Sequence, residues 1–445
     1  MKKQDLTQGP IGKQILLFAL PLMASSFIQQ LYNTVDLIYA GRLGTESTAA
    51  VGASSLVIAC IINFFTGLSV GMSVIASQAV GARDGDKVRR TIGTGMAISL
   101  IGGGALSVIG ILITPAMLGW INTPKEIMTQ GISYARCYLL SMIPIVTYNM
   151  NSGIMRAAGD SRTPMLYQLA GGLSNVVLNW VMVNVFDTGV GGIAIASVIA
   201  QGIAALLTVR FLAKSEGEYR LEAKNIRADR ETMLDVLRIG APAGVQAMVI
   251  TLSNVLVQSR INSYGVDTVA AFAAYFKVEL IVYTPIVAFG QAMMTFTGQN
   301  YGAGNMKRIK DGVRTTIIMG AVYAVVSAGL IMLFGTPVFR VFNSDPDVIS
   351  LGLRVIHVSF PFYWIYIILE TFADTLRGTG RSIPPMIIIL MNICVVRTIL
   401  LYYLTSRWHE IEAVAVTYPV TWGLTALFLT VYWFAARKKI LSGEH

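Results

Sequence analysis

Four polar residues stand in stretches of this 445-residue chain that are otherwise almost entirely apolar. Asp36 lies in "QQLYNTVDLIYAG", Asn175 and Asn179 lie in "SNVVLNW", and Ser197 lies in "IAIASVIA". In a helix, Asn175 and Asn179 would share one face, because they are four positions apart. Polar groups in apolar segments usually face a cavity or a partner, and a carboxylate can hold a cation or a proton. The alternatives to a functional role are structural. The asparagines could form hydrogen bonds between helices, and Asp36 could lie near the outer membrane interface.

Acidic residues also stand in apolar stretches of the second half of the chain. Glu279 and Glu370 are two of them, and Tyr366 precedes Glu370 by one helical turn. Charges in apolar segments tend to pair, so one interpretation is an ion-pair cluster with Lys277 or Arg397. The other interpretation is that these glutamates attract a cationic ligand. The sequence leaves both interpretations open.

The elements that carry these residues belong to an unusually apolar chain. Hydrophobic residues make up 54% of it and charged residues only 13%, against ~25% charged residues in a typical soluble protein. The uncharged runs "MAISLIGGGALSVIGILITPAMLGW" and "TTIIMGAVYAVVSAGLIMLFGTPVF" exceed the ~20 residues that cross a bilayer. The composition therefore predicts an all-α membrane protein whose surroundings are the lipid bilayer.

Hydropathy predicts twelve membrane-spanning helices, six in each half of the chain. The first six are expected at 15–40, 50–78, 92–118, 128–154, 164–186 and 191–213. The second six are expected at 236–261, 268–298, 314–337, 348–375, 384–405 and 412–436. The predicted domains are an N-terminal lobe over 1–213, a cytoplasmic linker over 214–235 in the form of a short helix, and a C-terminal lobe over 236–445.

The two halves repeat one another at a constant offset of 221 positions. Pro21 returns as Pro242 and Asn33 returns as Asn254, while "SQAVGARDGDKVRR" returns as "GQNYGAGNMKRIKD" and "RAAGDSRTP" as "RGTGRSIPP". A constant offset over this length indicates two copies of one folded unit. Because six spans per half bring both halves into the membrane in the same direction, the repeats should be parallel. Their pseudo-two-fold axis should then run along the membrane normal.

The polar set of the first half is missing from the second copy. At the same offset, Asp36, Asn175, Asn179 and Ser197 correspond to Val257, Val396, Leu400 and Tyr418. Polar residues that only join helices would more plausibly have been kept in both copies. The asymmetry therefore favours a functional role for the set.

Lysine and arginine predict the orientation in the membrane. Most of the 34 basic residues fall in segments on the same side as both termini, whereas the opposite loops hold Arg42, Lys125, Arg340 and Arg407. Basic residues favour the cytoplasmic side, so both termini are expected in the cytoplasm and the protein in the cell membrane. The net charge of +10 then lies along the cytoplasmic edge, near anionic lipid headgroups. No soluble domain gathers this charge into a face for nucleic acid.

In combination, these motifs resemble the multidrug and toxic compound extrusion (MATE) family over essentially the full length of the chain. The residues that carry the resemblance are Pro21, fifteen positions before Asp36, with "SQAVGARDGDKVRR" and "RAAGDSRTP". The resemblance implies a two-lobed, twelve-helix exporter of small molecules that is driven by Na⁺ or H⁺ and uses no other cofactor. It also implies a cation site in the first lobe, which maps onto Asp36, Asn175, Asn179 and Ser197.

Some members of the family have a second carboxylate where this chain has Asn179. With Asp36 as the sole anion, the site combines one negative charge with several neutral oxygens. This donor set suits Na⁺, held by Asp36, Asn175 and Asn179, and it also suits protonation of Asp36. The sequence does not separate Na⁺ coupling from H⁺ coupling.

Further residues are predicted to contact the transported molecule. Tyr32 and Asn33 lie one turn before Asp36, and Asn149 occupies the repeat position of Glu370. The candidate substrate residues are therefore Glu279, Glu370, Tyr366, Tyr32, Asn33 and Asn149.

Proline and glycine predict where the helices bend and approach one another. Pro21 and Pro242 lie early in the first and seventh spans, where a missing backbone hydrogen bond should kink the helix and provide a hinge. Gly67 and Gly71 have the small-residue spacing that allows two helices to approach closely.

These observations predict a monomeric, cation-coupled antiporter that exports amphipathic, often cationic, small molecules by alternating access. The alternative is a flippase for lipid-linked saccharides with the same architecture, which would need a basic cavity to receive a pyrophosphate. An enzyme is not expected, because the spans contain no visible constellation around a His, Cys or Ser nucleophile.

Overall fold

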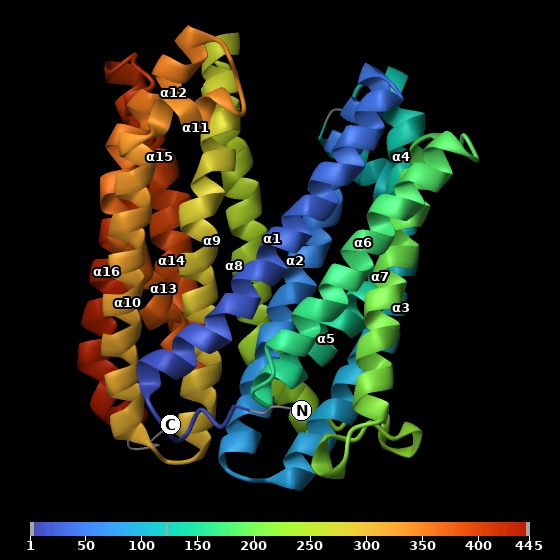
Figure 1. Cartoon of the computed structure of the whole chain (residues 1–445), viewed down its shortest axis with the longest axis vertical. Coiled ribbons are helices and arrows are strands. Elements are labelled where there is room, and N and C mark those ends of the chain that lie inside the picture. Colours follow the sequence, from blue (N-terminus) through green and yellow to red (C-terminus); the bar gives the residue numbers. More distant parts are fainter. Residues whose placement is uncertain (1–3, 122, 442–445) are drawn as a thin grey trace. The chain divides into compact units, whose positions relative to one another are not determined.

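The computed structural model describes residues 4–121 and 123–441, and all the regular secondary structure within these ranges is helical (Figure 1). The α-helices are α1 (Ile11–Arg42), α2 (Thr45–Gly81), α3 (Gly85–Trp120), α4 (Lys125–Leu139), α5 (Met142–Ala157), α6 (Arg162–Asn184), α7 (Gly189–Ala213), α8 (Arg230–Asn262), α9 (Val266–Gly302), α10 (Met306–Leu333), α11 (Gly335–Arg340), α12 (Pro346–Ser359), α13 (Tyr363–Gly378), α14 (Ile383–Ile389), α15 (Arg397–Arg407) and α16 (Glu412–Leu441). The other helical segments are η1 (Gly217–Tyr219), η2 (Ala223–Asn225), η3 (Phe360–Phe362) and the π-helical η4 (Leu390–Val396).

Within the described ranges, ten helical segments are long and apolar enough to cross a membrane. Two predicted spans are not among the ten. The span at 128–154 consists of α4 and α5, which contain 15 and 16 residues. The span at 164–186 is α6, whose buried Gln168, Asn175 and Asn179 lower its hydropathy. With these two, the helices form twelve segments, six in each repeat, and the prediction of an all-α membrane protein is confirmed.

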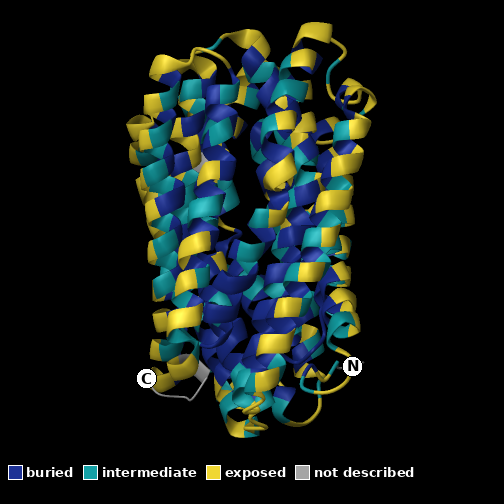
Figure 2. Ribbon diagram, turned by 90° about the vertical axis from the view of Figure 1, so that its left-hand side faces the viewer, coloured by how far each residue is buried: buried dark blue, intermediate teal, exposed yellow. Residues whose placement is uncertain are grey.

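Exposed residues recur along the long helices (Figure 2), and many of them are large and apolar, as expected for helices that face lipid. Leu112 of α3, Leu206 of α7 and Ile399 of α15 are 70%, 69% and 65% exposed, respectively. Leaving such side chains in water would be unfavourable, whereas lipid tails receive them without cost. The exposed faces therefore agree with the membrane environment that the composition predicts.

The boundaries of the helices preserve the internal repeat. Adding 221 to the bounds of α2 gives the bounds of α9, and adding it to the bounds of α5 gives those of α13. Backbone positions with positive φ recur at the same offset: Gly44 with Gly265, Arg83 with Gly304, and Gly159 with Gly380. Glycine adopts this conformation without steric penalty, so similar turns connect the helices of both copies.

The repeats differ where the predicted polar set lies. Helix α6 is continuous, whereas the matching part of the second repeat passes from α14 through the π-helical η4 into α15. A π-helix has a wider turn than an α-helix, so it changes the direction in which the following side chains point. Arg397, the first residue after η4, is buried.

Helix packing divides the chain into two compact units whose bounds differ from those of the predicted lobes. Unit 1 comprises Met1–Asp5 and Pro21–Met248, and unit 2 comprises Leu6–Leu20 and Val249–His445. Helices α1 and α8 are therefore each divided between the units. The first part of α1 belongs to unit 2, and the first part of α8 belongs to unit 1. The division of α1 falls at Pro21.

In unit 1, α8 approaches α2 at the level of the backbone. A Cβ atom added to Gly67 would lie 2.1 Å from the Gly244 nitrogen, and one added to Gly71 would lie 2.5 Å from the Val236 carbonyl oxygen. Any side chain at Gly67 or Gly71 would force the two helices apart. The predicted close approach at these glycines is confirmed, and α8 is the partner helix.

In unit 2, polar side chains of α9 and α10 hold the segment that precedes α1. The Leu6 N–H donates to Gln299 Oε1 at 3.0 Å. The Leu6 carbonyl accepts hydrogen bonds from Asn300 Nδ2 and Arg308 Nε, each at 3.1 Å. Since these bonds satisfy the backbone of a buried residue, they explain why the start of α1 belongs to unit 2.

The linker between α7 and α8 is not the single short helix that the sequence predicts. It forms the two three-residue turns η1 and η2 and lies against α3. A Cβ atom added to Gly93 of α3 would lie 2.0 Å from the Asn225 carbonyl oxygen, and Thr94 Oγ1 accepts the Asp229 N–H at 3.2 Å. Contact between the linker backbone and α3 leaves no room for the side chains of a full helix.

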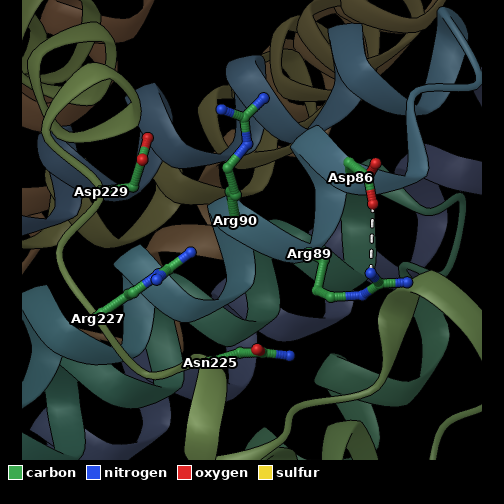
Figure 3. A pocket seen from close by; sticks show the side chains of 6 residues that line it. All are labelled: Asp86, Arg89, Arg90, Asn225, Arg227 and Asp229. Carbon is green, nitrogen blue, oxygen red and sulfur yellow. Dashed lines mark hydrogen bonds and ion pairs between the residues drawn. The ribbon is translucent and has the colours of Figure 1, made fainter.

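A cavity of about 380 Å³ lies beside this contact (Figure 3). It is lined by Asp86, Arg89, Arg90, Asn225, Arg227 and Asp229. Arg89 forms an ion pair with Asp86 at 3.3 Å, and Arg90 lies 3.8 Å from Glu231. The side chain and the N–H of Thr232 both donate to Asp229, and these bonds hold the pKa of Asp229 below its usual range. The Arg90–Glu231 pair therefore joins α3 to the start of α8, and the bonds from Thr232 hold Asp229 at the same helix end.

Candidate functional site

The structure brings Asp36, Asn175, Asn179 and Ser197 together in unit 1, from helices α1, α6 and α7. Asp36 Oδ1 accepts hydrogen bonds from Asn179 Nδ2 at 2.8 Å and Asn175 Nδ2 at 3.3 Å. Asp36 Oδ2 accepts a hydrogen bond from Ser197 Oγ at 2.8 Å. Asn175 and Asn179 reach Asp36 together because they lie one turn apart on α6, as their spacing predicts.

The electrostatics of this cluster are those of a buried anion among neutral partners. Asp36 is 6% exposed and Ser197 is 2% exposed, while Asn175 and Asn179 are fully buried. Among the described residues, no basic side chain forms an ion pair with Asp36. Three donors stabilise its carboxylate, but they do not neutralise its charge.

One oxygen of the cluster lacks a hydrogen-bond partner. Asn179 Oδ1 is buried and, within the described ranges, accepts no hydrogen bond. Leaving a buried amide oxygen unpaired is unfavourable. With Asp36 and the Ser197 hydroxyl it provides oxygen ligands of the kind that Na⁺ prefers. No group of three or more His, Cys, Asp or Glu side chains in the described part of the chain could hold a transition metal.

A cavity of about 450 Å³ in unit 1 borders this cluster. Asp36 and Ser197 line the cavity, whereas Asn175 and Asn179 do not. The two asparagines thus lie behind Asp36 and hold its carboxylate from the buried side. A molecule or ion in the cavity would reach the carboxylate directly.

Three of the predicted substrate residues line the same cavity, namely Tyr32, Asn33 and Asn149. The Tyr32 hydroxyl donates to the Gln168 carbonyl at 3.1 Å, and Asn149 Nδ2 donates to the carbonyl one turn earlier at 3.0 Å. These bonds orient both side chains. The candidate cation residues and part of the candidate substrate set therefore meet at one cavity.

The sequence analysis missed an aromatic wall of this cavity. Tyr134 and Tyr138 of α4 line it, with their ring centroids 5.9 Å apart. Their spacing of four positions in "ISYARCYLL" places them on one face of a helix, and this was the only available signal. Large planar rings beside a carboxylate suit a flat organic cation.

In unit 2, the predicted ion-pair cluster does not form. Among the described residues, neither Glu279 nor Glu370 has Lys277 or Arg397 within ion-pair distance. Lys277 lies two positions before Glu279 on α9, so the two side chains point to different faces of the helix. Lys277 is exposed. Arg397 packs over the Tyr418 ring, 4.7 Å from its centroid, and donates to Thr421 Oγ1 at 3.4 Å. Direct ion pairs between these residues are therefore absent from the described part of the chain, although Arg397 interacts electrostatically with Glu279.

The two glutamates lie among aromatic residues instead. The Tyr363 hydroxyl donates to Glu279 Oε1. Tyr366, one turn before Glu370, contacts the rings of Tyr283 and Trp422 at centroid distances of 5.5 and 5.3 Å. Acidic side chains beside several rings provide the chemistry that attracts an organic cation.

Asp374 forms an ion pair with Arg377, which also interacts electrostatically with Glu370. Arg377 Nη1 lies 2.5 Å from Asp374 Oδ1, and both side chains are nearly buried. Gly290 of α9 makes room for the acidic groups, since a Cβ atom there would lie 2.7 Å from Asp374 Oδ2 and 3.5 Å from Glu370 Oε2.

The predicted hinge residues Pro21 and Pro242 lie inside α1 and α8, and both helices continue through them.

Comparison with known proteins agrees with this arrangement. The sequence model of the MatE family matches residues 21–181 and 242–403, one match in each repeat. The probable multidrug resistance protein YpnP of Bacillus subtilis (strain 168) is 30% identical over 407 residues, which cover 89% of each chain. The probable multidrug resistance protein NorM of Thermotoga maritima is 25% identical over 391 residues, which cover 87% of this chain and 84% of NorM.

Solved structures share the fold. An outward-facing multidrug resistance MATE family transporter of the MOP superfamily superposes with a TM-score of 0.91 at 23% identity, covering 100% of this chain and 99% of that one. A MOP superfamily transporter from Pyrococcus furiosus superposes with a TM-score of 0.90 at 22% identity, covering 99% of both chains. With both repeats matched and the fold shared over its whole length, this chain is a multi-pass membrane protein that belongs to the MatE family.

Proposed function

We propose that this protein is a cation-coupled antiporter that exports amphipathic and cationic small molecules across the cell membrane. Membership of the MatE family supports transport, and the names of its relatives support multidrug efflux. A third group of relatives, the multidrug export protein MepA of Staphylococcus species, is 20–22% identical over 386 to 392 residues. The basic residues support an orientation with both termini in the cytoplasm.

The observation that carries the proposal is the environment of Asp36. Its carboxylate is buried, receives three neutral donors and borders a cavity, with no basic partner among the described residues. A carboxylate in this setting has an uncompensated charge, which Na⁺ or a proton can neutralise. Na⁺ would be held by Asp36, Ser197 and an asparagine oxygen such as Asn179 Oδ1.

Coupling requires that the bound cation alter the conformational equilibrium of the protein. A ligand changes an equilibrium only through a difference in its affinity for the two states. Asp36 lies on α1, whose first part belongs to unit 2 and whose remainder belongs to unit 1. A cation at Asp36 therefore acts on a helix shared by both units. We propose that Pro21, at the division, and Pro242 in α8 allow these helices to bend.

Each unit offers candidate substrate contacts of its own. Tyr32, Asn33 and Asn149 line the cavity of unit 1. Glu279, Glu370 and Tyr366 form an acidic and aromatic group in unit 2. Carboxylates and rings attract cations, whereas the apolar portions of the walls accept the rest of an amphipathic molecule.

The flippase alternative receives no support from the cavity of unit 1 that borders Asp36. A lipid-linked saccharide carries a pyrophosphate, which basic residues would have to bind. The residues given for this cavity include Asp36 but neither lysine nor arginine. An acidic wall would repel the pyrophosphate.

Flux in proteoliposomes tests the proposal. Purified protein should move a cationic dye against its concentration gradient when an opposing Na⁺ or H⁺ gradient is imposed. The two gradients are applied separately, with the membrane potential clamped. Dye flux that does not respond to either gradient would exclude cation-coupled antiport.

A further inference from the structure

A further cavity of unit 1, of about 560 Å³, lies where α6, α7 and the linker meet. Its walls include Tyr167, Arg210, Phe211, Lys214, Glu216 and Tyr219, and it is called the basic cavity below. Arg210 lies in the last turn of α7, and Lys214 follows four positions later at its C-cap. This spacing places both cations on one side of the helix end.

Within the described ranges, the two cations of the basic cavity stand without a charged partner. Among the described residues, no carboxylate lies within ion-pair distance of Arg210 or Lys214. The cavity in Figure 3 is different, because its arginines lie beside Asp86, Asp229 and Glu231. Glu216 provides a single negative charge in the basic cavity, so a positive charge remains unbalanced there.

Arg210 and Lys214 are not needed to cap α7. The Arg210 carbonyl accepts the Lys214 N–H at 3.1 Å, and the Leu212 carbonyl accepts N–H groups from Ser215 and Leu221 at 3.2 and 3.0 Å. The Ser215 hydroxyl donates to the Phe211 carbonyl at 2.9 Å. Since these donors satisfy the end of the helix, both basic side chains remain available to bind an anion.

The basic cavity adjoins a surface that faces lipid. Leu166 and Leu173 of α6 and Leu206 of α7 are 50%, 61% and 69% exposed, respectively. Tyr167 and Phe211, which line the cavity, pack edge to face with ring centroids 6.1 Å apart. Aromatic residues concentrate at the level of the headgroups, where one end of the ring is apolar and the other is wet.

The back of the cavity is closed by the linker. Tyr219 of η1 is buried, and burial raises its pKa to about 12, so its hydroxyl keeps its proton at neutral pH. A protonated hydroxyl adds no negative charge to the cavity.

We propose that the basic cavity binds the phosphate of an anionic phospholipid from the cytoplasmic leaflet. Arg210 and Lys214 neutralise the phosphate, and the acyl chains lie along the exposed leucines of α6 and α7. A lipid explains both the unpaired cations and the adjoining apolar surface, whereas a free phosphate explains only the cations. This proposal goes beyond cation-coupled transport and does not depend on it.

Lipid binding is measured by native mass spectrometry of the delipidated full-length protein titrated with phosphatidylglycerol or phosphatidylcholine. The wild type should prefer phosphatidylglycerol. The double variant Arg210→Gln/Lys214→Gln should lose about 30-fold in affinity for phosphatidylglycerol, since each basic residue at an anionic surface contributes a factor of roughly five. Its affinity for phosphatidylcholine should not change.

Two further variants make the result specific. Lys307→Gln/Lys310→Gln removes two exposed cations from α10 and should retain the preference. Arg210→Lys/Lys214→Arg preserves the charge and should retain most of it. Equal losses in the α10 control, or a wild type without preference, would overturn the proposal. If inorganic phosphate raised the unfolding temperature as much as phosphatidylglycerol does, the cavity would be a simple anion site and the lipid assignment would be wrong.

Discussion

Asn179 Nδ2 donates a 2.8 Å hydrogen bond to Asp36 Oδ1, although the two residues are 143 positions apart in the chain. The bond joins α6 to α1 inside unit 1, and it leaves Asn179 Oδ1 without a partner among the described residues. Asn179 therefore stabilises the carboxylate through its nitrogen and keeps an oxygen available. This oxygen is the atom of Asn179 that would serve as a ligand for Na⁺.

Asp36→Asn should remove coupling and leave the fold intact. Asparagine has nearly the same shape as aspartate but carries no charge, so neither Na⁺ nor H⁺ can be retained at the site. Gradient-driven efflux of a dye should fall to the level measured without a gradient, in vesicles with equal amounts of monodisperse protein. Asp187→Asn changes an exposed carboxylate in the loop before α7 and should behave as wild type. Normal gradient dependence in the Asp36 variant would refute the assignment.

Asn179→Ala and Ser197→Ala should alter the response to the driving cation for every substrate alike. A hydrogen bond to a charged group contributes about 1.5–3 kcal/mol, which corresponds to a change of roughly 10- to 100-fold in cation affinity. If Na⁺ drives transport, the Na⁺ concentration for half-maximal flux should rise. If H⁺ drives it, the anionic carboxylate loses a donor, and half-maximal flux should move to higher pH. An unchanged cation response in both variants would place these residues outside the site.

Glu279→Gln and Glu370→Gln should change the selectivity of transport. A carboxylate beside the bound molecule stabilises it only if that molecule is charged, so cationic dyes should lose several-fold more flux than matched neutral dyes. A panel of dye pairs in proteoliposomes measures this ratio. Glu46→Gln, at an exposed position in the first turn of α2, is the matched control. Equal losses for both classes of dye would assign the two glutamates a structural role.

Gly67→Ala should destabilise unit 1. Its Cβ atom would lie 2.1 Å from the Gly244 backbone nitrogen, so α2 and α8 would have to separate, and overpacking of this kind costs about 1–3 kcal/mol. Gly202→Ala in α7 meets no atom within 4 Å and should be neutral or stabilising by about 0.5–1 kcal/mol, since alanine favours the helix. Thermal unfolding of both variants in detergent measures the difference. Similar unfolding temperatures would contradict the close contact.

The class of the protein, its repeat and the members of the Asp36 cluster could all be predicted from the amino-acid sequence. Long uncharged runs have few alternatives to a membrane-spanning helix, because lipid leaves every backbone polar group to be satisfied within the segment. The offset between Pro21 and Pro242 carried over to the helix boundaries because both copies use the same turns. Asp36 could be recognised as a site residue because an acidic side chain inside a membrane-spanning segment needs partners for its charge.

The partners of the remaining residues depend on how the helices pack in three dimensions. Glu279 contacts Tyr363 of α13 and not Arg397, because the direction of each side chain depends on helix rotation and on the π-helical η4. Tyr134 and Tyr138 line the cavity of Asp36 because α4 packs against α2 and α7, and such contacts join residues far apart in the chain. The division of α1 at Pro21 likewise depends on packing, since hydropathy does not distinguish one apolar neighbour from another.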